Sequence, residues 1–231
     1  MPPMPIIVFD LDGTLADTAG DLMGALNSVL ARDGLAPLPV DQARSLLGAG
    51  GRALIERGYA SVGRSLTKPR LEQLFGYFLE HYEAHIADHS RLFPGALDAI
   101  ERLETRGFTL AVCTNKMEHA AVRLMTELGV ADRFRAICGQ DTFAVCKPEA
   151  GALLGTIDRA GGDRLHAVMV GDSVTDIATA KAAGIPVVAV DFGYTDVPVT
   201  ELAPDRVISH FDELAEAIDG VLAARDAPAP T

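Results

Sequence analysis

The chain has 231 residues, with 20 Lys and Arg against 32 Asp and Glu, so its formal net charge at pH 7 is -12. A charge this negative argues against nucleic acid or an anionic membrane surface as a partner. The length predicts one or two domains, and a hydrophobic content of 48% is ordinary for a globular chain. The Met-Pro-Pro-Met-Pro start lacks the basic and apolar regions of a signal peptide, and no apolar stretch approaches the ~20 residues of a membrane span.

The cysteines indicate a reducing compartment. Cys113, Cys138 and Cys146 lie within or beside apolar runs, and no two of them have C-x-x-C spacing. We therefore expect buried thiols in a cytoplasmic protein. We expect no nucleic-acid or membrane partner, and either a monomer or a homodimer.

The first motif in chain order combines an apolar run with two acids. Residues 6–9 predict a buried strand, and Asp10 and Asp12 follow it two residues apart. In extended geometry both carboxylates point to the same side, and Gly13 then permits a tight turn beside the hydroxyl of Thr14. Two like charges ~4 Å apart repel by about 4 kcal/mol at an effective dielectric constant near 20. The pair therefore indicates a nucleophile, an acid/base and a divalent metal, although Asp-Gly is also a common turn pair.

The apolar spacing within residues 18–90 predicts a helical insertion. Four segments show helical spacing of apolar residues, namely 21–31, 40–47, 52–59 and 71–87, and breaks occur at 34–39 and 48–51. We expect two linkers, near Asp17 and near Arg91. A helical segment held in this way can close over a small substrate and exclude water.

From residue 109 onward, predicted strands and helices alternate. Strands are expected at 109–113, 167–170, 186–190 and, more weakly, 205–208; helices are expected at 94–106, 117–128, 173–183 and 211–222, with Lys147-Pro148 opening a further helical segment. This order predicts an α/β fold with a doubly wound parallel sheet. We assign 1–17 and 91–231 to an α/β core, 18–90 to a helical cap, and 226–231 to a frayed tail.

Polar residues follow three of the predicted strands. Thr114 and Asn115 come after the second strand, and Asp172 comes after the third, with Asp176 close behind. Ligands of open parallel sheets bind at the carboxyl ends of the strands, so we expect these residues to converge with Asp10, Asp12 and Lys147 in one crevice. Carboxylate oxygens, a carbonyl and water are the ligands that Mg²⁺ prefers.

These four motifs resemble those of the haloacid dehalogenase superfamily of phosphatases, in the same order. The resemblance covers nearly the whole chain and implies a Rossmann-like core with a helical cap. It implies a phospho-aspartate at Asp10, with Asp12 as general acid/base that also binds Mg²⁺ through its backbone carbonyl. Asp10 and Asp172 would be metal ligands as well. Asp176 would bind metal, orient metal-bound water or hold Lys147; it could also simply be a helix first-turn acid.

The resemblance also assigns the phosphate ligands. Thr114 and Asn115 would donate hydrogen bonds to the phosphoryl oxygens, and Lys147 would offset their charge. Outer segments, at 9–18, 92–95, 112–116, 139–143 and 190–195, resemble those of bacterial phosphoglycolate phosphatases. This favours 2-phosphoglycolate as substrate, with Arg52 or Lys116 as a cation for its carboxylate.

Other readings remain open at this point. A pyrophosphatase, a sugar-phosphate phosphatase and a phosphomutase of the same superfamily share the four motifs. A response-regulator receiver also surrounds a phosphorylated Asp with acids, a hydroxyl and a lysine, but its phosphorylated Asp lies on a middle strand and it has no helical insertion. A non-catalytic relative would lack one of the motif residues, and none is missing here.

Overall fold

The computed structural model describes residues 4–40, 46–48 and 50–226 of the chain. Its centre is a six-stranded sheet in the order β5-β4-β1-β6-β7-β8, in which every neighbouring pair is parallel. Because the chain proceeds from β1 first toward one edge and then toward the other, the sheet is doubly wound, as the sequence predicts. The strands are β1 (Met4–Phe9), β4 (Thr109–Cys113), β5 (Ala136–Cys138), β6 (Gly162–Gly171), β7 (Val187–Val190) and β8 (Arg206–Ile208).

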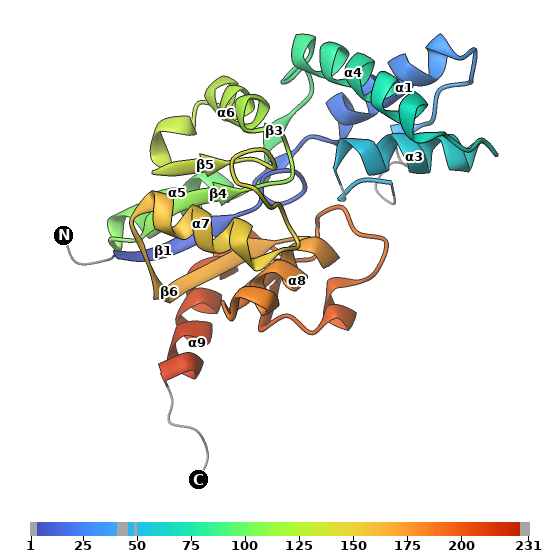
Figure 1. Cartoon of the computed structure of the whole chain (residues 1–231). Coiled ribbons are helices and arrows are strands. Elements are labelled where there is room, and N and C mark those ends of the chain that lie inside the picture. Colours follow the sequence, from blue (N-terminus) through green and yellow to red (C-terminus); the bar gives the residue numbers. More distant parts are fainter. Residues whose placement is uncertain (1–3, 41–45, 49, 227–231) are drawn as a thin grey trace.

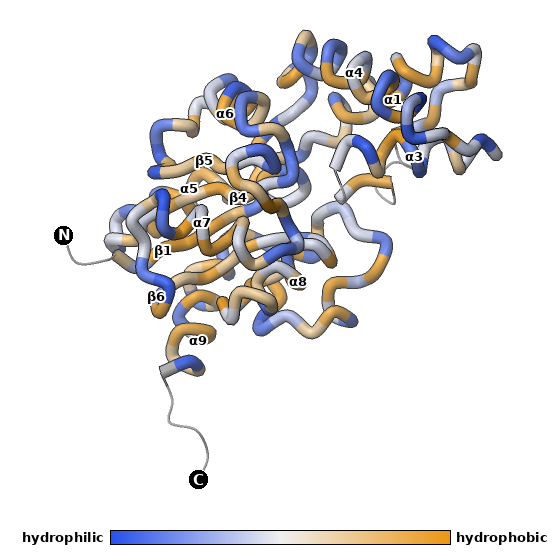
Figure 2. Tube along the Cα trace, viewed as in Figure 1, coloured by the Kyte–Doolittle hydropathy of each residue, from blue (hydrophilic) through white to orange (hydrophobic). Residues whose placement is uncertain are grey.

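Helices cover both faces of this sheet (Figure 1). Along β1, Ile6 and Val8 belong to one buried cluster and Ile7 and Phe9 to the other, because successive side chains of a strand point to opposite faces. The cluster with Ile6 includes residues of α7 (Ala150–Ala160) and α8 (Val174–Ala183); the other includes residues of α5 (Ala96–Thr105), α6 (Glu118–Glu127) and α9 (Leu214–Asp226). Figure 2 shows apolar residues along the central strands, whereas the surrounding helices carry both apolar and polar residues.

In the described part of 18–90, three helices form a group beside the carboxyl ends of the strands (Figure 1). They are α1 (Ala19–Arg32), α3 (Gly51–Ser61) and α4 (Lys68–Ala84), and each packs against the other two. Leu26, Leu54 and Phe78 are buried among them. No strand occurs in the described part of 18–90, in agreement with the helical insertion expected there. The helix expected at 40–47 lies mostly outside the described residues, as does most of the expected tail.

The two connections of this helical group lie next to each other. Strand β2 (Ala16–Asp17) leads into α1 and pairs antiparallel with β3 (Arg91–Leu92), on which the chain returns. The buried carboxylate of Asp21 accepts hydrogen bonds from the backbone amides of His89 and Ser90 at 3.0 and 2.8 Å. The insertion therefore leaves and re-enters the rest of the chain at one place.

The differences from the sequence-based elements concern short segments. Strand β5 was not predicted, because Ala136–Cys138 is too short to show a periodic pattern. Strand β6 begins at Gly162 rather than near residue 167, since the pairing of Met4 with Gly162 extends it through an exposed stretch without apolar periodicity. Short 3-10 helices lie at Ala131–Arg133, Val199–Leu202 and Phe211–Glu213, the last of which begins the expected final helix. Among the described residues, no helix is both long and apolar enough to cross a membrane.

Candidate active site

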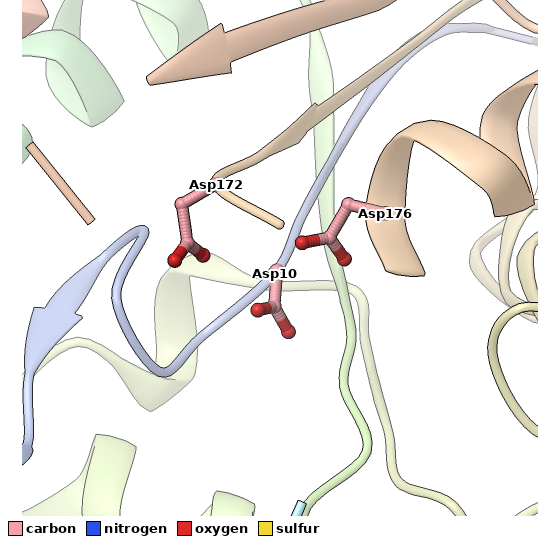
Figure 3. Close-up of side chains that lie close together, drawn as sticks. All are labelled: Asp10, Asp172 and Asp176. Carbon is pink, nitrogen blue, oxygen red and sulfur yellow. The ribbon is translucent and has the colours of Figure 1, made fainter. Parts of the chain in front are cut away.

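Three carboxylates meet at the carboxyl edge of the sheet (Figure 3). Asp10 directly follows β1, Asp172 directly follows β6, and Asp176 lies in the first turn of α8. All three residues are buried, and each offers an oxygen within 4.8 Å of an oxygen of the others. Strands β1 and β6 are neighbours in the sheet, so residues more than 150 positions apart in the chain are brought together, as expected from the positions of the motifs.

One ammonium group lies inside this acidic cluster. Nζ of Lys147 lies 2.7 Å from Oδ1 of Asp10 and 2.6 Å from Oδ1 of Asp176. The Lys147 side chain is 3% exposed, so these ion pairs are little screened by water. Burial by itself would lower the pKa of Lys147, but the two carboxylates raise it above its ordinary value. The lysine therefore stays charged, and among the described residues it is the cation that the ion pairs place against these acids.

Burial, together with the excess of negative charge, raises the pKa values of two of these acids, Asp10 and Asp172. Burial raises the pKa of Asp10 to about 7, against the attraction of Lys147, and the charge of Asp176 adds to the increase. Burial also raises the pKa of Asp172 well above 3.8, with further contributions from Asp176 and Asp10. A buried set of carboxylate oxygens with more negative charge than Lys147 offsets fits a hard divalent cation such as Mg²⁺, which would keep the acids ionised.

Two hydrogen bonds and a close glycine backbone hold the carboxylate of Asp172 in place. Its Oδ1 accepts a hydrogen bond from the hydroxyl of Thr14 at 2.7 Å, and its Oδ2 accepts one from the backbone amide of Tyr194 at 2.6 Å. A Cβ at Gly13 would lie 2.5 Å from Oδ2 of Asp172, and Gly13 has a φ of 87°. The glycine of the first motif is thus required twice, for its backbone conformation and for the space that Asp172 occupies.

Asp176 has two partners, one for each of its oxygens. Its Oδ2 accepts hydrogen bonds from the backbone amide and the hydroxyl of Ser173 at 3.1 and 2.6 Å, and Oγ of Ser173 accepts one from the Asp176 amide at 3.3 Å, which forms a capping box at the start of α8. Its Oδ1 holds Lys147. The first-turn role and the lysine-holding role expected as alternatives therefore occur together.

The carboxylate of Asp12 is outside the three-acid cluster and has different partners. Its Oδ1 accepts a hydrogen bond from the hydroxyl of Thr18 at 2.7 Å, and Oδ2 lies 3.0 Å from Nζ of Lys116. Nζ of Lys116 also donates to the hydroxyl of Tyr82 on α4, at 2.9 Å. Asp12 therefore faces the helical group, whereas Asp10 faces Lys147.

Thr114 and Asn115 follow β4, which is the neighbour of β1 on the side opposite to β6. Oγ1 of Thr114 accepts a hydrogen bond from the backbone amide of Lys116 at 3.2 Å, and Thr114 is buried. Nδ2 of Asn115 donates to the backbone carbonyl of Lys147 at 3.1 Å, whereas Oδ1 of Asn115 is buried without a partner among the described residues. The structure thus brings Asn115 into contact with Lys147, and Thr114 lines the same pocket as both, as the strand-end argument predicts.

Arg52 is not brought to this site. Its guanidinium forms two hydrogen bonds with the carboxylate of Glu72, at 2.8 and 2.9 Å, and its Cζ lies 3.8 Å from the centre of the Phe75 ring. The Arg52 side chain is 44% exposed and does not line the pocket described below. A bidentate carboxylate and an aromatic face satisfy the guanidinium on the surface of the helical group, so the glycine-rich stretch before α3 does not deliver it to the crevice.

A pocket of about 740 Å³, counting the space at its open mouth, lies between the strand ends and the helical group. Its core side combines the polar residues already described, namely Asp10, Asp12, Thr114, Asn115, Lys116 and Lys147. Its opposite side is mostly apolar and includes Leu54, Phe75, Phe78 and Leu79. Six of the residues selected from the sequence therefore share one cavity, and the helical group forms its roof.

Three contact residues were missed in the sequence-based assignment of the site. Thr18 and Tyr194 lie within segments that carry the resemblance, but nothing in the sequence alone gave them a role. Tyr82 lies on an apolar helix face and has no motif around it. Their hydroxyls contact Asp12, the start of α1 and Lys116 respectively, which are relations that only the folded chain reveals.

Comparison with known proteins agrees with this architecture. Residues 7–190 match the family model described as haloacid dehalogenase-like hydrolase, and this span contains all four motifs. The chain belongs to this family of hydrolases, and its curated relatives, described next, show that it is a phosphatase enzyme.

The relatives narrow the class further. A phosphoglycolate phosphatase of Mesorhizobium japonicum is 53% identical over 93% of this chain and 96% of its own length. A phosphoglycolate phosphatase of Agrobacterium fabrum is 45% identical over 99% of this chain and 98% of its own. The crystal structure of a predicted phosphoglycolate phosphatase from Haemophilus somnus, 27% identical, superimposes with a TM-score of 0.84 over 94% of this chain and 98% of that one.

Proposed function

We propose that this protein is a Mg²⁺-dependent phosphatase that hydrolyses 2-phosphoglycolate to glycolate and phosphate. The observation that carries the substrate is the 53% identity, over 93% of the chain, to a relative named phosphoglycolate phosphatase. The buried cluster of Asp10, Asp172 and Asp176 supports the metal. Among the described residues of the pocket, no contact favours sugar phosphates, pyrophosphate or a mutase reaction.

Asp10 acts as the nucleophile. Lys147 binds its Oδ1, and no described residue donates to its Oδ2, so one carboxylate oxygen is available for the phosphorus atom. A new bond forms between this oxygen and phosphorus while the ester bond to glycolate breaks, which leaves a phospho-aspartate. Water then attacks phosphorus and releases phosphate and free Asp10.

Asp12 acts as the general acid and base. Its carboxyl group protonates the ester oxygen as that oxygen leaves, and it then takes a proton from the attacking water. The hydroxyl of Thr18 and the ammonium group of Lys116 fix the orientation of its two oxygens. Asp12 is thus held by contacts separate from those that hold Asp10.

The remaining residues of the site bind and orient. Thr114, Asn115 and Lys147 bind the phosphoryl oxygens. Asp10, Asp172 and the backbone carbonyl of Asp12 would hold Mg²⁺, which supplies charge stabilisation to the transferred phosphoryl group. Asp176 has both oxygens engaged by Ser173 and Lys147, so we assign it to positioning Lys147 at the edge of the metal site.

Residues 18–90 serve as a cap, and 1–17 with 91–231 serve as the catalytic core. The pairing of β2 with β3 supports this division, because both connections pass through one short antiparallel ladder. The apolar roof of the pocket comes from this segment, so its closure shields the ester from bulk water while the phosphoryl group passes to Asp10, and the water that hydrolyses the phospho-aspartate enters afterwards.

The test is phosphate release from a panel of esters, with and without Mg²⁺. The panel holds 2-phosphoglycolate, glycerol phosphate, hexose phosphates and pyrophosphate. We expect the highest kcat/KM for 2-phosphoglycolate and no turnover after chelation. A higher kcat/KM for a hexose phosphate or pyrophosphate would reject the substrate, and full activity after exhaustive chelation would reject the metal.

A further inference from the structure

We propose that the hydroxyl of Tyr82 and the ammonium group of Lys116 form the binding site for the substrate's carboxylate. The inference rests on the proposed function and assigns the discrimination between phosphate esters with and without a carboxylate to Tyr82 of the helical group together with Lys116 of the core side. Tyr82 and Lys116 would be specificity-determining residues, one from each side of the pocket.

The two donors are already held together. Nζ of Lys116 donates to the Tyr82 hydroxyl at 2.9 Å and lies 4.3 Å from the centre of the same ring. The ring is packed against Phe78, with centroids 6.1 Å apart and planes inclined by 8°, and Tyr82 is 2% exposed. A rigid, buried ring fixes the hydroxyl at low entropic cost before a ligand arrives.

Each of these groups keeps a hydrogen to donate. Because the Tyr82 oxygen accepts the bond from Lys116, its own O–H hydrogen is free, and it has no acceptor among the described residues. Burial raises the pKa of Tyr82 to about 12, so the hydroxyl retains this hydrogen at neutral pH. Nζ of Lys116 has three hydrogens and two partners, Asp12 and Tyr82. Two donors from two side chains match the two oxygens of a carboxylate.

Among the described residues of 18–90 that line the pocket, Tyr82 is the one with a polar side chain. The other described residues of 18–90 that line the pocket are leucines, phenylalanines and glycines. A carboxylate enclosed there without donors would cost several kcal/mol. With Arg52 engaged by Glu72 outside the pocket, the hydroxyl that remains available at the roof among the described residues is that of Tyr82, and the cation that contacts it is Lys116 from the core side.

The position of the pair also matches the length of the substrate. Asp12, the proton donor to the ester oxygen, lies 3.0 Å from Lys116, and Lys116 lies 2.9 Å from Tyr82. In 2-phosphoglycolate the carboxylate carbon is two bonds beyond the ester oxygen. A substrate whose ester oxygen contacts Asp12 therefore presents its carboxylate to the next groups along the wall, which are Lys116 and Tyr82.

The test is Tyr82→Phe, which keeps the ring and removes the hydroxyl. The measurement is the ratio of kcat/KM for 2-phosphoglycolate to kcat/KM for ethyl phosphate, which lacks the carboxylate. We expect this ratio to fall by roughly tenfold to a hundredfold, as for one hydrogen bond to a charged group, with most of the change in KM. The matched control is Tyr77→Phe on the same helix, whose ring lies under Arg32 and outside the pocket, and which should leave the ratio unchanged.

A binding measurement covers the case in which Tyr82→Phe folds poorly. Inhibition by glycolate needs the carboxylate site, so its inhibition constant should rise roughly tenfold or more in Tyr82→Phe relative to the inhibition constant for inorganic phosphate, in the fraction that remains folded. An unchanged substrate ratio and an unchanged glycolate constant would overturn the inference while leaving 2-phosphoglycolate as substrate. An equal loss of kcat for both esters would also overturn it, because the hydroxyl would then act through Asp12. If the unmutated enzyme shows no preference for 2-phosphoglycolate over ethyl phosphate, the proposed function itself fails.

Discussion

The hydroxyl of Tyr194 accepts hydrogen bonds from the backbone amides of Thr18 and Ala19, at 2.7 and 2.9 Å. The backbone amide of the same tyrosine donates to Oδ2 of Asp172 at 2.6 Å, and its hydroxyl also contacts the carboxylate of Asp17. Tyr194 therefore joins the loop after β7 to both the acidic cluster and the start of the helical group. A side chain that contacts the site and the connection to α1 positions one relative to the other.

Removing this hydroxyl should weaken the connection. Tyr194→Phe leaves two backbone amides and the Asp17 carboxylate without their partner, which should lower the free energy of unfolding by about 1–3 kcal/mol. The measurement is thermal or urea unfolding, with Tyr77→Phe as the control for loss of a tyrosine hydroxyl outside the pocket. Equal stability of Tyr194→Phe and the unmutated protein would show that the contact does not hold the connection.

Metal dependence follows from the three buried acids. We expect EDTA to abolish phosphatase activity and Mg²⁺ to restore it. Asp172→Asn should raise the Mg²⁺ concentration for half-maximal activity by at least roughly tenfold, because a neutral amide replaces a charged ligand. Asp158→Asn, which changes an exposed acid beside Arg164, serves as the matched control. Unaltered Mg²⁺ dependence in Asp172→Asn would remove this residue from the metal site.

The metal-free protein should lose stability with rising pH through Asp10. Burial raises the pKa of Asp10 from 3.8 to about 7, so the folded state binds its proton more tightly than the unfolded state does. The stability gained from that proton is complete below pH 3.8 and is lost as the pH rises to about 7. Asp10→Asn cannot ionise. The difference in Tm, variant minus unmutated protein, should therefore increase across this window in EDTA and shrink when Mg²⁺ is added. A flat difference in EDTA would contradict the electrostatic account of the cluster.

The effect of removing the proton donor on the reaction rate should depend on the leaving group of the ester. Asp12→Asn should reduce kcat for 2-phosphoglycolate by roughly 10²–10⁴-fold, the usual contribution of general acid–base catalysis. p-Nitrophenol leaves without protonation, so the phosphorylation step with p-nitrophenyl phosphate should be reduced much less. Pre-steady-state release of p-nitrophenol measures that step directly. An equal reduction for both esters would mean that Asp12 serves the site in some other way.

The sequence predicts most of this fold because its long elements carry clear periodic patterns. The strand before Asp10 and the helices of residues 18–90 are recognisable from apolar spacing alone. Strand β5 and the ladder of β2 with β3 are not, since elements of two or three residues have no period and form through their neighbours in space. Pairing, rather than composition, defines them.

The residues of the site likewise fall into those that the sequence pattern indicates and those that it does not. Asp10 and Asp172 could be selected because each follows a recognisable strand, and parallel strands bring such ends together. Lys147, which lies in the turn before α7, was selected from the order of the four motifs. Arg52 was selected for its charge and its glycine-rich surroundings, and no sequence pattern revealed that Glu72, 20 residues further on, would bind it instead. Tyr82 was overlooked for the opposite reason, because an aromatic residue on an apolar helix face is typical of a core position.

The most direct test of the account is the covalent fate of the phosphoryl group. The enzyme is mixed with Mg²⁺ and 2-phosphoglycolate carrying a labelled phosphoryl group, quenched with acid during turnover, and digested for peptide mapping. We predict label on the peptide that contains Asp10, and none in Asp10→Asn or in EDTA. Rapid turnover of 2-phosphoglycolate without labelled protein, or label on a residue other than Asp10, would contradict the mechanism.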